Sequence, residues 1–117
     1  MVVDDRQQEL TDAEVDRIFH ALADATRRDI VRRTLTGEAS VSTLAATYAM
    51  SFAAVQKHVA VLEGAGLVTK HRAGRERLVR GNVTTIQRAQ ELLDRYEQLW
   101  RSRISQLDDL LAEDPQE

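Results

Sequence analysis

The chain has 117 residues, of which 43% are hydrophobic and 30% are charged, and its formal net charge is −3. This length and composition are typical of one helix-rich domain, and the chain is too short for two independent hydrophobic cores. The chain has no apolar run of the roughly 18 to 20 residues that cross a bilayer, no signal-peptide pattern and no cysteine, which excludes membrane spans, disulfides and thiolate metal sites. We therefore expect a cytoplasmic protein that does not contact membranes.

The charge is distributed unevenly along the chain. Residues 1–16 carry six acids against one arginine, and residues 105–117 carry five acids and no base. Residues 57–80 carry six lysines or arginines against two glutamates. Because exposed charges more than about 8 to 10 Å apart are screened at physiological salt, this basic patch can bind phosphate despite the negative total.

The N-terminal segment predicts a tail followed by a short helix. Residues 1–10 are polar and acidic without apolar periodicity, which predicts a disordered tail. Thr11 and Glu14 have the spacing of a capping box, so a helix should begin there. The apolar residues that follow recur at i, i+3, i+4 and i+7, and this stripe exceeds what a short helix needs to cover a core. We therefore assign it to a dimer interface, with residues Val15, Ile18, Phe19 and Leu22.

A second helix is predicted over residues 25–35, with Asp24 as its N-cap. It carries four arginines on faces away from its apolar side, namely Arg27, Arg28, Arg32 and Arg33. Contacts to phosphate are one interpretation. A solvated face whose arginines pair with nearby acids is the commoner outcome, and we favour it.

A helix-turn-helix is predicted around the middle of the chain. Ser40 or Ser42 should begin a third helix that ends near Tyr48, and only two residues then separate it from Ser51. The turn lacks the glycine often found there. Ala49 or a neighbour must therefore adopt the turn geometry at some cost in free energy.

The second helix of this pair, residues 51–63, has one apolar stripe and one open face. Ser51 is a suitable N-cap, the stripe consists of Val55, Val59 and Leu62, and two glycines follow the helix. The opposite face is small or polar and has no acid before Glu63, so it can approach DNA in the major groove. An ordinary surface helix would be the favoured interpretation of this segment in isolation, and the segments around it reverse that preference.

A basic β-hairpin is predicted over residues 67–80, with a turn at 73–76. Arg72, Arg75 and Arg77 lie near its tip, where arginines can follow the DNA backbone or enter a narrow minor groove. Charge that protects an exposed edge strand is the competing interpretation. We favour DNA contact because the hairpin follows a helix-turn-helix directly, as a wing does.

A long final helix is predicted from about residue 84 to 111, capped by Asn82 or a threonine. Its length of about 39 Å, at 1.5 Å per residue, exceeds what a small winged domain can cover. Its apolar residues recur in steps of three and four, so part of this stripe needs a partner. We expect a two-fold dimer built from the first and last helices, with interface residues that include Leu93, Tyr96, Trp100, Ile104 and Leu107. The domain would then span residues 11–112, followed by a tail at 113–117.

The order of these elements resembles the ArsR/SmtB family of bacterial winged-helix repressors over residues 15–111. The resemblance is carried by residues 21–28, 44–45 and 51–68 and by Gly74 and Arg75. It implies a mainly α fold with a small β-hairpin (α+β) and a homodimer that binds a pseudo-palindromic operator in double-stranded DNA and represses transcription. Matched position by position, it implies DNA contacts from Ser51, Ala53, Ala54, Gln56, Lys57 and His58.

The chemistry of these side chains differs. Gln56 can pair with adenine and Lys57 can contact guanine or phosphate, whereas Ser51 is better suited to fixing register. His58 lies on the shoulder of the buried stripe, where packing is as plausible as base contact.

The sensory and catalytic features known from other proteins are missing. Metal sensors of the family use a cysteine motif in the third helix or His and carboxylate ligands on the last helix, but residues 40–44 contain no cysteine and the last helix contains no histidine. We therefore predict no metal and no cofactor. The absence of a cysteine nucleophile and of a phosphate-binding glycine loop argues against an enzyme. Two alternatives remain open on the same fold: a small-molecule sensor whose inducer is unknown, with a cavity near Tyr96 and Trp100, or a protein-interaction module.

Overall fold

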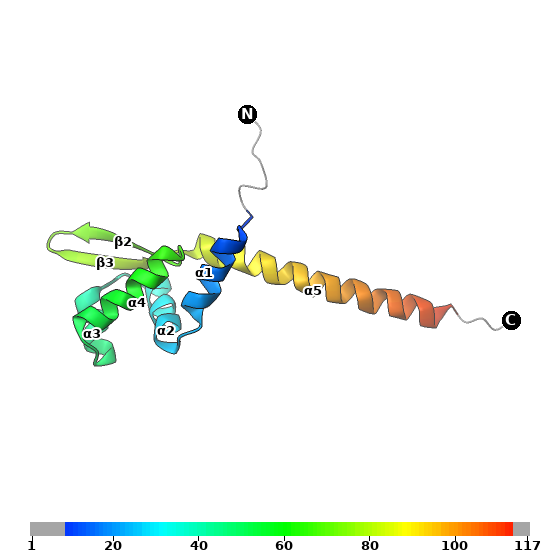
Figure 1. The fold of residues 1–117 in the computed structure, drawn as a ribbon, viewed down its shortest axis with the longest axis horizontal. Coiled ribbons are helices and arrows are strands. Elements are labelled where there is room, and N and C mark those ends of the chain that lie inside the picture. The colour runs from blue at the N-terminus through cyan, green and yellow to red at the C-terminus, as the bar shows by residue number, and fades with distance from the viewer. Residues whose placement is uncertain (1–8, 114–117) are drawn as a thin grey trace, which may run out of the picture.

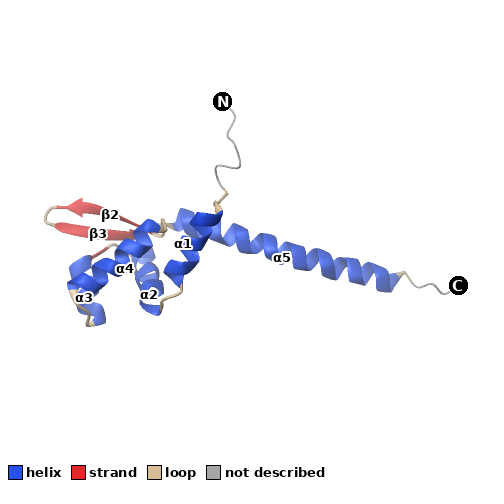
Figure 2. Cartoon of the chain, viewed as in Figure 1, coloured by secondary structure: helices blue, strands red, loops and turns tan. Residues whose placement is uncertain are grey.

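The computed structural model describes residues 9–113, in which five helices and three short strands follow one another along the chain. Four helices and a β-hairpin gather at one end of the molecule, and the last helix projects from them (Figures 1 and 2). The elements are α1 Asp12–Leu22, α2 Ala25–Thr36, β1 Ala39–Ser40, α3 Val41–Tyr48, α4 Phe52–Gly64, β2 Val68–Ala73, β3 Glu76–Gly81 and α5 Val83–Ala112. This arrangement confirms the predicted α+β winged helix-turn-helix. The predicted tails lie mostly outside the described residues.

The helices begin at the side chains that the sequence predicts. Thr11 and Glu14 form a reciprocal capping box, with N···O distances of 3.1 and 2.8 Å, and the bond from the Thr11 amide holds the pKa of Glu14 below its usual value. The remaining N-caps each accept a bond from a backbone amide two or three residues later, and they are Asp24, Ser40, Ser51 and Asn82. Local sequence therefore determines where each helix starts.

The helix-turn-helix is closed by an alanine in the left-handed conformation. Ala49 has φ 54° and ψ 37°, and the next amide, that of Met50, donates to the carbonyl of Ala45 at 3.2 Å. Gly66 ends α4 in the same way with φ 75°, a conformation that costs glycine nothing. Ala49 is therefore the residue that adopts the turn geometry in place of a glycine, and its Cβ disfavours this conformation by about 1 to 2 kcal/mol.

The three strands form one antiparallel sheet in the order β1-β3-β2. The β2–β3 hairpin closes through a two-residue loop that begins with Gly74 at φ 65°, a conformation in which glycine is favoured. Ala39 of β1 pairs with Val79 of β3, which anchors the base of the wing to the segment between α2 and α3. The strand β1 could not be predicted from the sequence, because two residues carry no periodic pattern.

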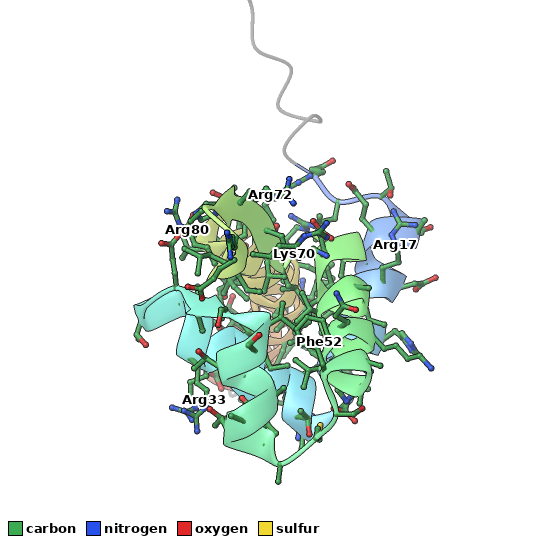
Figure 3. The ribbon with its side chains drawn as sticks, turned by 90° about the vertical axis from the view of Figure 1, so that its left-hand side faces the viewer. Arg17, Arg33, Phe52, Lys70, Arg72 and Arg80 are labelled. Carbon is green, nitrogen blue, oxygen red and sulfur yellow. The ribbon has the colours of Figure 1, made fainter. Side chains whose placement is uncertain are left out.

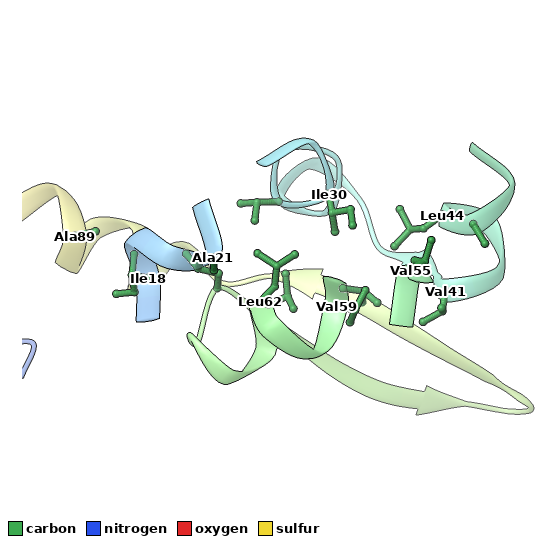
Figure 4. Close-up of a cluster of buried hydrophobic side chains, with 14 residues drawn as sticks. Ile18, Ala21, Ile30, Val41, Leu44, Val55, Val59, Leu62 and Ala89 are labelled. Atoms are coloured by element: carbon green, nitrogen blue, oxygen red, sulfur yellow. The ribbon is translucent and has the colours of Figure 1, made fainter. Parts of the chain in front are cut away.

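The hydrophobic core lies around α4 (Figure 4). The buried stripe predicted for this helix, Val55, Val59 and Leu62, is fully inaccessible and packs among residues of the other helices and of the sheet. Ile18 corrects one prediction. We expected it at a dimer interface, but only 1% of it is exposed, because α1 turns it into the protomer core.

Helix α5 is covered only at its beginning. Thr85 and Ala89 are buried against the winged domain, whereas every residue from 101 to 113 is exposed. Figure 1 shows this helix extending away from the rest of the chain. None of the helices in the described part of the chain is long and apolar enough to span a membrane.

Candidate DNA-binding surface

Four of the six DNA contacts predicted for α4 and its N-cap are exposed, namely Ser51, Ala53, Gln56 and Lys57. Ala54 is half-buried. The small Ala53 leaves room for the helix to approach another surface closely. Within residues 9–113, the side chains of Gln56 and Lys57 make no hydrogen bond or ion pair, so both are available to a ligand.

His58 points toward α2 rather than along the open face. Its Nδ1 lies 3.4 Å from Nη1 of Arg27 and 3.9 Å from Oδ2 of Asp24, and the side chain is largely buried. This geometry favours the packing interpretation. A base contact from His58 stays a prediction that would require its other ring nitrogen.

The four arginines of α2 are occupied within the protomer. Arg27 and Arg28 donate to carbonyl oxygens at the end of α1, at distances of 2.7, 3.0 and 2.8 Å. Arg32 and Arg33 pair with Asp29 of the same helix. These contacts support the interpretation of a structural role over phosphate binding.

A partly buried side-chain contact between α2 and α3 positions the helix-turn-helix. The Tyr48 hydroxyl donates to Oδ2 of Asp29 at 2.6 Å, and Arg33 lies over the tyrosine ring at 5.6 Å from its centre. The bonds from Tyr48 and the two arginines hold the pKa of Asp29 well below its usual range. Desolvation and the bond to Asp29 raise the pKa of Tyr48 to about 12. The end of α3, and therefore the start of α4, is held against α2.

The tip of the wing carries three exposed arginines, Arg72, Arg75 and Arg77. Within the described residues none of them makes an ion pair or a side-chain hydrogen bond. Arg72 and Arg77 are direct cross-strand partners, and like charges at such positions repel. Figure 3 shows the end of the molecule that carries this tip together with the helix-turn-helix. A polyanion bound there would relieve the repulsion.

The basic residues at the base of the wing have a different role. Lys70 lies 3.5 Å from Glu63 of α4, and Glu38 accepts from both Arg80 and His71 at 2.7 and 3.0 Å. These pairs join the hairpin to α4 and to the segment before β1. Positive charge at the base is neutralised, so the free charge is concentrated at the tip.

A groove of about 330 Å³ separates the start of α4 from the wing tip, and its lining includes Phe52, Gln56, Arg75 and Arg77. Phe52 is 48% exposed, and sequence analysis did not assign it to the site. The available signal was a large apolar residue at the first position of the helix, three residues before Val55.

Comparison with known proteins identifies the family. A helix-turn-helix domain model matches residues 22–71. The HTH-type transcriptional regulator Rv2034 of Mycobacterium tuberculosis is 40% identical over 81 residues, which are 69% of this chain and 76% of that protein. The crystal structure of the ArsR family transcriptional regulator RHA00566 is 32% identical, with a TM-score of 0.74, and the match covers 80% of this chain and 97% of that one. The chain belongs to the ArsR family of transcriptional regulators.

An ArsR-like transcriptional regulator from Rhodococcus sp. RHA1 is similar over 84% of this chain and 92% of its own, at 30% identity and a TM-score of 0.75. These relatives are transcriptional regulators. The surface formed by α4 and the wing is therefore the helix-turn-helix surface of an ArsR-family regulator.

The predicted dimer residues of this ArsR-family regulator differ in exposure, and Ile18 lies in the protomer core. Val15 and Leu22 of α1 are half-buried, and Phe19 is exposed. The α5 residues are between 37% and 61% exposed, and they are Leu93, Tyr96, Trp100, Ile104 and Leu107. Over residues 9–113, no group of three or more His, Asp or Glu side chains is placed to hold a metal ion.

Proposed function

We propose that this ArsR-family regulator is a cytoplasmic homodimeric repressor without catalytic activity, which binds a pseudo-palindromic operator. The observation that carries the proposal is the set of free basic side chains beside the open face of α4, from Lys57 to the three arginines of the wing tip. Every other basic residue discussed above is paired within the protomer. Unpaired positive charge gathered on one helix-turn-helix surface supports binding to the DNA backbone.

In the proposed complex, the N-terminal half of α4 lies in the major groove. Gln56 is suited to adenine and Lys57 to guanine or phosphate, while Ser51 and the two alanines allow close approach. Arg72, Arg75 and Arg77 extend toward the flanking backbone and minor groove. Base readout would come from few side chains, so half-site spacing and DNA shape contribute to specificity.

The exposed stripe of α5 supports the homodimer. Leu93, Tyr96 and Trp100 are followed after 11 residues by Ile104, Leu107 and Leu111. An 11-residue repeat keeps an apolar stripe almost straight along a helix. Ala89, 11 residues before Trp100, lies on the same line and is buried against the protomer's own domain. The stripe therefore continues from the core into solvent, where a second copy of α5 would cover it.

In this geometry, repression would result from occupancy of the operator by the dimer. A two-fold dimer presents two α4 helices to successive major-groove faces, so the half-sites should be about 34 to 36 Å apart. A dimer held there by both helices and both wings would obstruct transcription from an overlapping promoter.

The proposal is tested by selecting binding sites from random-sequence DNA and from genomic fragments that include the regulator's own promoter, at physiological salt. We expect an inverted repeat, and we expect Lys57→Ala to weaken binding with a smaller salt slope. Selection of no preferred sequence would count against the proposal.

Light scattering tests the dimer. The wild-type chain should have the mass of two copies, and Leu107→Glu, which places a charge in the exposed stripe without touching the core, should reduce it to one. A wild-type monomer would refute the homodimer and would favour the interaction-module alternative.

A further inference from the structure

The aromatic residue at the start of α4 is only partly covered by the rest of the protomer. Phe52 is 48% exposed, whereas Val55, Val59 and Leu62, which anchor the helix, are fully buried. Among the described residues of α3, α4 and the wing, it is the one exposed large hydrophobic side chain. Figure 3 shows it on the same end of the molecule as Lys70 and Arg72 of the wing. An isolated aromatic on a polar, basic surface indicates a specific apolar contact in the complex.

The neighbours of Phe52 define the kind of contact. Gln56 lies one helical turn later beside the same groove, and the wing lines the groove with Arg75, Glu76 and Arg77. Residues at the N-terminal end of a recognition helix contact base edges. In the major groove, the apolar group presented by base pairs is the C5-methyl of thymine, with which phenylalanine makes favourable contact.

We propose that Phe52 contacts a thymine methyl group in each half-site, beside the base pair read by Gln56, and so determines part of the operator's specificity. The inference rests on the proposed function, because it requires α4 to lie in the major groove. It adds a sequence requirement, a thymine close to the adenine that suits Gln56. The contact would also shield the ring, which is exposed in the free protein.

The test uses the duplex that the wild-type protein selects from random-sequence DNA. Each thymine is replaced in turn by uracil, which pairs identically and lacks only the methyl group. We expect one thymine position in each half-site to be sensitive. Substitution in one half-site should lower the affinity about fourfold, and substitution in both should lower it roughly fifteenfold. In Phe52→Ala this difference between thymine and uracil should vanish, while Phe52→Leu should keep part of it.

Lys57→Ala is the matched control, because it should weaken binding to the thymine and uracil duplexes equally and leave their ratio unchanged. Circular dichroism melting should show that Phe52→Ala folds, as its half-exposed side chain predicts. A thymine-to-uracil ratio that is the same in wild type and Phe52→Ala at every position would overturn the inference. That result would leave the repressor proposal intact, whereas failure to select any site would refute the repressor proposal itself.

Discussion

The pair of arginines at the wing tip should oppose folding and support DNA binding at the same time. Arg72 and Arg77 are cross-strand partners one step from the two-residue loop, at a position where ladder hydrogen bonds are absent and side chains lie closest. The change Arg77→Glu replaces a repulsive pair with an attractive one. It should therefore stabilise the free protein while it weakens the complex.

The expected magnitudes are modest for folding and large for binding. Removing one like-charge pair and creating an opposite-charge pair at exposed positions should stabilise the fold by about 0.5 to 1 kcal/mol, which raises Tm by roughly 2 to 6 °C. In a dimer, losing one phosphate contact per protomer lowers the slope of log K against log salt by about 1.8. The same loss corresponds to an affinity decrease on the order of 30-fold at 0.15 M salt.

The assays are thermal melting at a fixed protein concentration, because dimerisation shifts Tm, and operator titration at several salt concentrations. Arg77→Gln should give about half the rise in Tm with a similar change in slope. Arg80→Gln is the matched control on the same strand, since Arg80 pairs with Glu38 at 2.7 Å and should not contribute to the slope. A lower Tm for Arg77→Glu, or an unchanged salt slope, would refute the reasoning.

Three further predictions concern the scaffold. Ala49→Gly should stabilise the protein by about 0.5 to 1 kcal/mol in urea unfolding. The strain that the left-handed conformation causes in alanine is removed, and this gain exceeds the cost of the greater unfolded-state entropy of glycine. A destabilised variant would contradict this prediction. Gly81→Ala should destabilise it by about 1 to 3 kcal/mol in the same assay, since the new Cβ would lie 2.8 Å from the Leu35 side chain and 2.9 Å from its backbone nitrogen. Tyr48→Phe should cost about 1 kcal/mol at pH 7. Because folding raises the pKa of Tyr48 from 10.0 to about 12, its contribution is present below pH 10 and lost between pH 10 and 12, so the wild-type and variant stabilities should converge there.

Much of the candidate DNA-binding surface could be predicted because its signals are local. The cap at Ser51, the stripe of α4 and the basic hairpin depend on residues within a few positions of one another, and their order identifies the winged helix-turn-helix. The exposure of Ser51, Ala53, Gln56 and Lys57 follows from the same helical period. Which bases they contact stays a prediction.

Only the tertiary structure decided which charged and apolar residues are free. The arginines of α2 and those of the wing tip look alike in the sequence. Those of α2 contact backbone carbonyls and Asp29, whereas those of the wing tip contact no partner within the described residues. Ile18 likewise lies in the protomer core and not at the expected dimer interface. A helical period places side chains on faces, but it does not say which neighbouring element covers each face. The packing of side chains in the folded chain therefore decides which residues stay available, whereas local capping and periodicity determine the elements that carry them.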